Sequence, residues 1–329
     1  MRTISGQTLD LKSSQNPRAV RDELSAGIED QVQALHHLSG WHRSRELLFF
    51  IALYGLGALT MVLGNGHWVI SAAAVAIMGL AMNSSGLFIH EGLHGLLWNG
   101  RRTNRLLSFL VGIPSLMSAS AYRVTHTYHH FELGKARDLG TYRQHARSRL
   151  LVWLAYFAQL IAGSLIYVLM VPVFAWRFSS KRARLSIIVE YAAILGILAI
   201  VGVIVETQVI VKFWLLPLLV MNFLTNLRGL ASHALGDVEN IYLASRTVMS
   251  PRWVSWLLLH ENFHLEHHLF PKVPSYHLSE LHRLIWPRLP NALKSESYGS
   301  FLKQFAKAAL RLDLQPLGVV TPASEKKPG

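Results

Sequence analysis

The chain has no cysteine among its 329 residues. Disulfide bonds, thiol nucleophiles, cysteine zinc sites and cysteine-bound iron–sulfur clusters are therefore excluded for this sequence. Gly-rich nucleotide-binding loops and internal repeats of solenoid period are also lacking. A metal in this protein must be bound by histidine, carboxylate or amide groups.

Acidic residues are scarce, with 19 Asp and Glu against 32 Lys and Arg, which gives a formal net charge of +13. A basic excess is typical of nucleic-acid binding, but here the Lys and Arg residues flank long apolar runs. We interpret the charge as the positive-inside bias of a membrane protein, with contacts to anionic lipid headgroups. No nucleic-acid partner is expected.

Long apolar runs are abundant, and 51% of the residues are hydrophobic. Four runs approach the ~20 residues needed to cross a bilayer. They pair around short polar turns, so we predict an all-α integral membrane protein with four transmembrane helices in two hairpins. The predicted crossings are 47–63, 68–89, 185–205 and 209–227.

The basic residues also predict the orientation of the hairpins. Residues 1–45 carry six Lys or Arg, whereas the turn at 64–67 carries none. Both termini and the histidine-rich segments are therefore expected on the cytoplasmic side. Two further apolar stretches, 106–121 and 150–176, are flanked by basic residues and are expected to lie in the membrane plane without crossing. An apolar substrate chain is expected to run along these two stretches.

The predicted organisation has three parts. They are a cytoplasmic N-terminal segment (1–45), a membrane domain whose histidines form a cytoplasmic cap (46–290), and a cytoplasmic C-terminal helix and tail (291–329).

Histidine is concentrated in three short boxes, which hold eight of the 17 histidines. The boxes read H-E-G-L-H at 90–94, H-T-Y-H-H at 126–130 and H-L-E-H-H at 264–268. Residues three and four positions apart share one face of a helix, so each box directs its imidazoles at one small volume. A ninth histidine follows the last predicted crossing. The predicted metal ligands are His90, His94, His126, His129, His130, His233, His264, His267 and His268.

Nine imidazoles exceed the needs of one catalytic zinc ion, which takes three protein ligands, but they suit two metal ions with four or five ligands each. Imidazole binds iron, zinc and copper, and iron is the candidate that suits dioxygen activation.

The three boxes, in their order and spacing, resemble those of the membrane fatty acid desaturase and hydroxylase superfamily. The segment 262–274 is similar to the bacterial desaturase pattern around the last box. The resemblance implies a centre of two iron ions on the eight box histidines, with His233 as the family's extra histidine. It also implies O2 as a substrate and an external electron donor, either a ferredoxin or a small haem protein.

Fatty acyl desaturation is the activity that the resemblance favours, acting on a lipid acyl or other long apolar chain. A lipid, carotenoid or alkane hydroxylase or ketolase of the same superfamily is the alternative. A more distant alternative is a membrane zinc metalloprotease, because His90, Glu91 and His94 match H-E-x-x-H. A metal transporter would instead place histidines along a membrane path.

Two further expectations concern residues near the boxes. Four acidic residues are candidates for orienting the imidazoles through their ring N–H groups: Glu91, Glu266, Asp138 and Asp237. His277 and His282 lie outside the boxes and are expected to tolerate replacement.

Overall fold

The computed structural model describes residues 17–133, 148–236, 244–289 and 292–318, together with the single positions 135, 142 and 146. Over these residues the chain is mostly helical, as predicted, with one pair of short parallel strands. It divides into two compact units. The bundle unit comprises Leu38–Phe131 and Tyr156–Leu230, and the C-terminal unit comprises Met1–His37, Glu132–Ala155 and Ala231–Gly329.

Most of the long helices contribute to the bundle unit. They are α3 (Gly40–Leu63), α4 (Trp68–His94), α5 (Arg101–Gly112), the 3₁₀ turn η1 (Ile113–Ser115), α6 (Ala119–Glu132), α8 (Arg149–Phe178), α9 (Lys181–Ile204), α10 (Thr207–Ile210), the π turn η2 (Val211–Leu215) and α11 (Leu216–His233). The beginning of α8 and the ends of α6 and α11 belong to the C-terminal unit.

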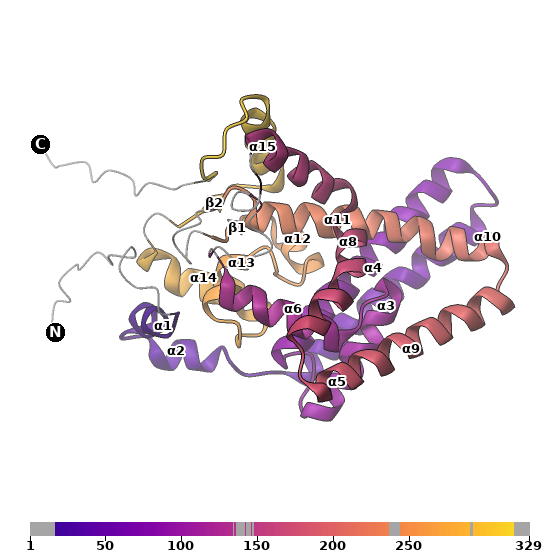
Figure 1. Cartoon of the computed structure of the whole chain (residues 1–329), viewed down its shortest axis with the longest axis horizontal. Helices are drawn as coiled ribbons and strands as arrows, with labels where there is room; N and C mark the ends of the chain where they lie inside the picture. The colour runs from indigo at the N-terminus through magenta and orange to yellow at the C-terminus, as the bar shows by residue number, and fades with distance from the viewer. Residues whose placement is uncertain are drawn as a thin grey trace, which may run out of the picture. The chain divides into compact units, whose positions relative to one another are not determined.

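The first predicted hairpin is present as α3 and α4, which lie side by side (Figure 1). The Ser39 hydroxyl accepts a hydrogen bond from the His42 N–H and so caps α3, which begins seven residues before the predicted start. The second helix of the hairpin, α4, stops directly after His94 because Gly95 takes the left-handed conformation, with φ of +83°. The first histidine box therefore occupies the last turns of α4.

The second predicted hairpin is formed by α9 and by the nearly continuous run of α10, η2 and α11. Its π turn is fixed to other helices of the bundle unit at two points. The Trp214 indole N–H donates to the Pro114 carbonyl at 2.9 Å, and the Tyr54 hydroxyl donates to the Phe213 carbonyl at 2.5 Å. These contacts hold the second hairpin against α3 and η1.

The stretch 150–176 forms most of α8, a single helix of 30 residues. Its length and apolar composition make it a fifth candidate for crossing a membrane, beside the four predicted spans. The side-chain amide of Asn226 in α11 bonds to the backbone of α8 in the middle of this helix. The Asn226 Oδ1 accepts from the Ser164 N–H at 2.7 Å, and its Nδ2 donates to the Leu160 carbonyl at 3.3 Å. The amide thus bonds to both the N–H and the carbonyl that an α-helix pairs at positions i and i−4.

We expect reporter fusions at Asn65 and Gln208 to read as external and a fusion at Lys181 to read as cytoplasmic. The physical reason is that Lys and Arg are retained on the cytoplasmic side, and both ends of α8 are basic. Alkaline phosphatase and fluorescent-protein fusions measure this directly. An external Lys181 would make α8 a crossing helix and contradict the four-crossing prediction.

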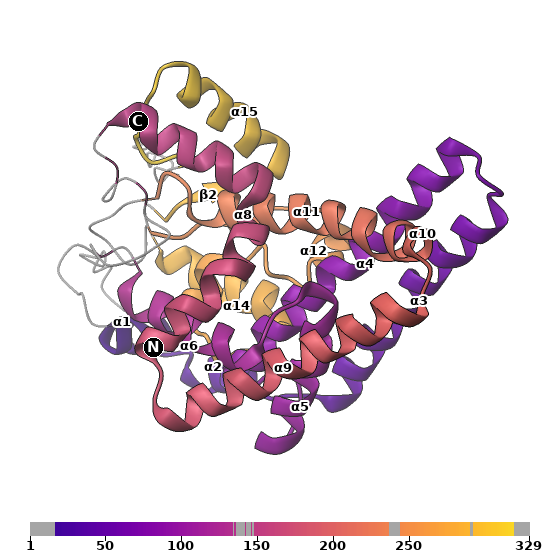
Figure 2. The same cartoon turned by 45° about the vertical axis from the view of Figure 1, so that its right-hand side comes forward.

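The C-terminal unit consists of short elements around an apolar core. They are α1 (Pro17–Ser25), α2 (Glu29–Ala34), β1 (Thr247–Val248), α12 (Arg252–Leu257), α13 (His264–Leu269), η3 (Ser275–His277), α14 (Leu278–Ile285), η4 (Trp286–Arg288), β2 (Lys294–Ser295) and α15 (Tyr298–Leu310). The core is built from buried Val, Leu, Ile and Phe residues of α1, α2, α13 and α14. The first turns of α8 pack on α15, where the rings of Trp153 and Phe305 lie 4.9 Å apart (Figure 2).

A buried arginine closes the end of α11 within this unit. Arg246 is fully buried and donates hydrogen bonds to the carbonyls of Ala231, Ala234 and Leu235. The last carbonyls of a helix have no partner inside the helix, so the guanidinium satisfies groups that burial would otherwise leave unpaired. His233, the last residue of α11, is held in place by this cap.

Candidate metal centre

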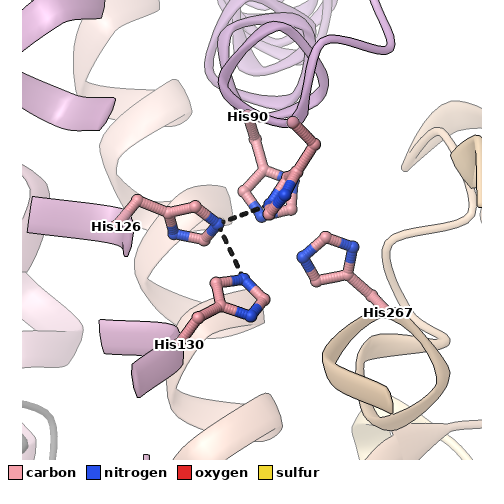
Figure 3. A group of neighbouring side chains, drawn as sticks. His90, His126, His130 and His267 are labelled. Atoms are coloured by element: carbon pink, nitrogen blue, oxygen red, sulfur yellow. Dashed lines mark hydrogen bonds between the residues drawn. The ribbon is translucent and has the colours of Figure 1, made fainter. Parts of the chain in front are cut away.

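The bundle unit brings together four imidazoles from two helices. His90 and His94 lie on the last turns of α4, and His126 and His130 lie on α6. Each offers a ring nitrogen within 4.8 Å of the other three. The Nε2 atom of His126 lies 2.8 Å from that of His94 and 3.0 Å from that of His130. Figure 3 shows His90, His126 and His130 directed toward one another. We call these four residues the bundle cluster.

His126 is the central residue of the bundle cluster. Burial lowers its pKa well below the ordinary histidine value, and the neighbouring imidazoles, His90 first, lower it further. A neutral imidazole keeps the lone pair that a metal ion needs. His129 lies beside the cluster, with its ring centroid 6.0 Å from that of His130.

The C-terminal unit holds a second convergence of imidazoles. His233 ends α11, whereas His264 and His268 lie one turn apart on α13. The Nε2 atom of His264 lies 2.9 Å from that of His233 and 3.2 Å from that of His268. His267 lies beside them, with its ring centroid 5.6 Å from those of His264 and His268. We call these four residues the C-terminal cluster.

The donor atoms in both clusters fit metal ions. A ring nitrogen carries either one proton or one lone pair, so the central Nε2 of each cluster can hydrogen-bond one of its two Nε2 neighbours but not both. A metal ion satisfies all of them through their lone pairs. Nitrogen ligands ~2.1 Å from a metal ion and at right angles lie ~3.0 Å apart, close to the observed separations. The Nδ1 atom of His233 faces the Ala244 carbonyl at 3.3 Å, which places the proton on Nδ1 and leaves Nε2 as the ligand atom.

The second box is attached to the first by Arg123 on α6. Its guanidinium donates to the carbonyls of Leu93 and Gly92, at 3.0 and 3.1 Å. Gly92 also meets α5 closely, because a Cβ atom there would collide with the Ser108 hydroxyl. The glycine of H-E-G-L-H is therefore required by packing, and the end of α4 is fixed from two sides.

A carboxylate in an apolar helix fixes the other end of α6. Glu190 of α9 accepts hydrogen bonds from the Ser118 hydroxyl at 2.7 Å, the Ser120 N–H at 2.9 Å and the Ser120 hydroxyl at 2.5 Å. A negative charge is favourable at a helix N-terminus, where N–H groups lack partners. Sequence reasoning missed Glu190, although an acidic residue inside a predicted crossing is a signal of function or of a specific partner.

Replacing Glu190 with leucine is expected to destabilise the protein by about 1.5–3 kcal/mol, the range for hydrogen bonds to a charged group. Because the lost contacts hold the helix of the second box, we also expect weaker metal binding by the bundle cluster. Unfolding in mixed micelles and metal content measure the two effects. Glu206→Gln at the exposed start of α10 is the control. A Glu190→Leu protein with wild-type stability and metal content would show that α6 is held by other contacts.

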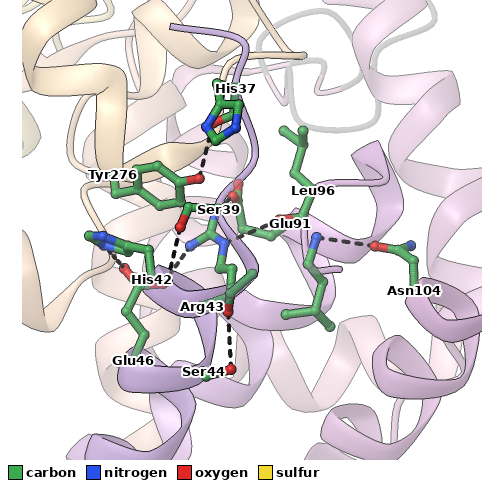
Figure 4. Close-up of polar contacts among 12 residues, drawn as sticks. His37, Ser39, His42, Arg43, Ser44, Glu46, Glu91, Leu96, Asn104 and Tyr276 are labelled. Atoms are coloured by element: carbon green, nitrogen blue, oxygen red, sulfur yellow. Dashed lines mark hydrogen bonds and ion pairs between the residues drawn. The ribbon is translucent and has the colours of Figure 1, made fainter. Parts of the chain in front are cut away.

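The first and third boxes each contain an acidic residue, and both carboxylates contact other side chains of the protein. The Glu91 carboxylate pairs with the guanidinium of Arg43, and both side chains are fully buried. Arg43 also donates to the Glu46 carboxylate at 2.7 Å and to the Leu96 carbonyl at 3.1 Å (Figure 4). The ion pair thus attaches the first box to the start of α3.

Glu266 in the third box has both carboxylate oxygens engaged by Thr247 and His282. In the described part of the chain, the imidazole that Glu266 bonds to is therefore that of His282, outside the boxes. The other two acidic candidates, Asp138 and Asp237, lie outside the described residues.

The sequence of the chain is similar to those of known proteins. A family model described as fatty acid desaturase matches residues 66–299, a span that includes all three boxes. The sn-1 oleoyl-lipid 12-desaturase of Synechocystis sp. is 26% identical over 252 residues, covering 68% of each chain. The dihydrorhizobitoxine desaturase of Bradyrhizobium elkanii is 26% identical over 70% of this chain and 71% of its own. A fatty acid desaturase of Bacillus subtilis is 24% identical over 71% of this chain and 73% of its own.

Proposed function

We propose that this chain, which belongs to the fatty acid desaturase family, introduces a double bond into a lipid acyl chain with two iron ions and O2. The family consists of membrane oxidoreductases, and the chain has several helices apolar enough to be membrane-spanning. The observation that carries the proposal is the convergence of three Nε2 atoms in each of the two histidine clusters.

Under this proposal one iron ion is held by the bundle cluster and the other by the C-terminal cluster. Iron bound to imidazole ligands supplies the activation of dioxygen that removal of hydrogen from an unactivated C–H bond requires. The overall reaction takes one hydrogen from each of two neighbouring carbons. With two electrons and two protons from outside, it converts O2 to two molecules of water.

The protein residues have the task of orienting ligands and holding them rigid. His233 keeps its proton on Nδ1, facing the Ala244 carbonyl, so that Nε2 stays directed at the metal position. Arg123, Glu190 and Arg43 fix the helices that carry the first two boxes. We propose that an external ferredoxin or small haem protein supplies the electrons at the cytoplasmic face, because the sequence has no cysteine for an iron–sulfur cluster of its own.

The zinc-protease alternative is weakened by the position of Glu91. A general base must have its carboxylate at the water that attacks the substrate. Here Glu91 is fully buried and paired with Arg43. That alternative also gives no role to the histidines of the C-terminal cluster.

A cavity in the bundle unit is suited to an acyl chain. Its volume is about 550 Å³, within the range of ligand pockets, and no charged residue lines it. Its walls come from α3, α4, α9, η2 and the segment around η1, and include Phe50, Phe88, Val111 and Trp214. Phe88 stands two residues before His90, so one wall leads to the first box. We propose that this cavity receives part of the substrate chain.

Filling this cavity is expected to change the products. Ala81 lines it and is buried, so Ala81→Phe should shorten the longest chain that the enzyme accepts while leaving it folded. Ala72→Phe on the exposed face of the same helix is the matched control. Lipid analysis by mass spectrometry gives the chain lengths. An unchanged product profile in a folded Ala81→Phe protein would mean that the substrate does not enter the cavity.

Three small residues in the stretches 106–121 and 150–176, along which a substrate chain is expected to run, are poor sites for this test. A Cβ at Gly112 would lie 2.5 Å from the Met117 carbonyl, and one at Gly163 would lie 2.9 Å from the Asn226 Oδ1. Ser118 is fully buried and bonded to Glu190. Larger side chains at these positions would strain the bundle before they reached a ligand.

The activity itself is tested by expression in a host that lacks desaturases, followed by mass spectrometry of the extracted lipids. Loss of two hydrogens from an acyl chain supports the proposal. Gain of one oxygen atom would instead assign the chain to the hydroxylase alternative. Unchanged lipids in the presence of a supplied ferredoxin and its reductase would contradict both.

A further inference from the structure

The third histidine box lies on a helix that is too short to be stable alone. The helix α13 has six residues, well below the ~12–15 at which isolated helices become even marginally stable. Three imidazoles of the C-terminal cluster depend on it. Their direction must therefore be set by whatever holds α13 from outside.

Two side chains hold α13 through the carboxylate of Glu266. This residue is fully buried. Its Oε2 accepts a hydrogen bond from the Thr247 hydroxyl at 2.6 Å, and its Oε1 lies 2.5 Å from the Nδ1 of His282. Because a carboxylate accepts hydrogen bonds, the proton is on Nδ1 of His282. A buried anion that loses such a donor is strongly disfavoured.

The ring of His282 also makes apolar contacts next to the box. Its centroid lies 5.2 Å from that of Phe263, the residue before His264, and 4.9 Å from that of Trp286. Leu278, Leu281 and Ile285, on the same helix as His282, join Phe263 and Leu265 in the buried core. One face of α14 is thus packed on α13, and His282 is its polar contact.

We propose that His282 is a positioning residue for the third histidine box, acting on the metal ligands through Glu266. The inference rests on the proposed function, since it presumes that the C-terminal cluster binds a metal ion. His282 is not itself a ligand in this arrangement, because its Nδ1 is occupied by Glu266 and its ring packs against those of Phe263 and Trp286. The contacts reverse the earlier expectation that His282 tolerates replacement. His277 is half-buried, lies 4.0 Å from Glu280 and is still expected to tolerate replacement.

The test compares three single variants of the purified full chain loaded with Co²⁺, whose absorption spectrum reports its ligand geometry. His282→Asn retains a donor near the Nδ1 position, His282→Leu retains bulk without a donor, and His277→Asn is the control. We expect His282→Leu to release Co²⁺ about 10–100-fold faster than the wild type, the usual cost of losing a group that orients a metal ligand. His282→Asn should restore most of the retention, and His277→Asn should match the wild type.

The double variant Glu266→Leu/His282→Leu keeps the test valid if His282→Leu alone does not fold. Replacing both buried polar partners by apolar groups avoids an unpaired carboxylate, so the fold should persist. Fast Co²⁺ release from this folded protein is expected.

The outcomes separate the inference from the function on which it rests. Wild-type retention of Co²⁺ in folded His282→Leu would overturn the positioning role. Equal losses of Co²⁺ retention in His282→Leu and His282→Asn would also overturn it, because they would indicate a role in packing alone. Wild-type protein that binds no Co²⁺ at all would contradict the metal site itself and the inference with it. A changed Co²⁺ spectrum in His282→Leu, restored in His282→Asn, supports the inference.

Discussion

Alanine in place of His126 or His264 is expected to abolish desaturation, because each residue is the centre of its cluster. The Nε2 atom of His126 contacts two other Nε2 atoms of the bundle cluster, and that of His264 contacts two in the C-terminal cluster. Loss of a group that merely orients a ligand costs ~10–100-fold in metal affinity or activity, so loss of the ligand should exceed ~100-fold.

The metal content of these two variants distinguishes the clusters. If each cluster binds its own iron ion, each variant should lose one ion and keep the other, which elemental analysis and Mössbauer spectroscopy of the purified protein can measure. His67→Ala is the control, since His67 is exposed at the start of α4 and its side chain caps nothing. Full activity in either cluster variant would refute the assignment of that cluster.

Methionine in place of Arg43 should destabilise the protein by about 3–5 kcal/mol, the usual cost of removing one partner from a buried ion pair. Arg43 is fully buried between Glu91 and Glu46, whose side chains are 0% and 2% exposed. Its loss leaves two carboxylates without a guanidinium in the interior. The change should also loosen His90 and His94, which flank Glu91, so activity should fall together with stability.

A paired replacement and an exposed control make this prediction specific. Arg43→Met/Glu91→Gln removes the uncompensated charge next to the box and should recover part of the stability. Arg45→Met, two residues further along α3 on an exposed side chain, should change unfolding little. Denaturant unfolding in micelles measures all three proteins. If Arg43→Met is as stable as Arg45→Met, the ion pair does not hold the first box.

The parts of this protein that sequence reasoning could predict are those encoded by local spacing. Apolar run length predicts the helices at 47–63, 68–89, 185–205 and 209–227, and the structure has helices there. The i, i+3 and i+4 spacing of the boxes predicts shared faces, and within each unit the imidazoles converge. Both features follow from helix geometry alone. The number of crossings stays a prediction, because α8 is equally long and apolar.

The supporting contacts could not be predicted in the same way. Arg43 and Glu91 are 48 positions apart in the sequence, and Ser120 and Glu190 are separated by 70. No local pattern relates such residues, since their pairing depends on how helices pack. His282 lies outside the boxes, which is why the sequence predicts that it tolerates replacement, yet it is largely buried against Glu266. Glu190 in α9 did give a local signal of a specific partner, because carboxylates are rare in apolar spans.

The bonds that Asn226 makes to the backbone of α8 have a consequence for biosynthesis in the membrane. Asn226 follows Ser164 by 62 residues, so α8 leaves the ribosome before its partner exists. When α11 arrives, Asn222 and Asn226 bring amide groups that lipid cannot satisfy, and the backbone of α8 supplies their partners. Stable integration of α11 is therefore expected to require α8 beside it at the insertion machinery, so that deleting α8 would leave α11 exposed to quality-control proteolysis.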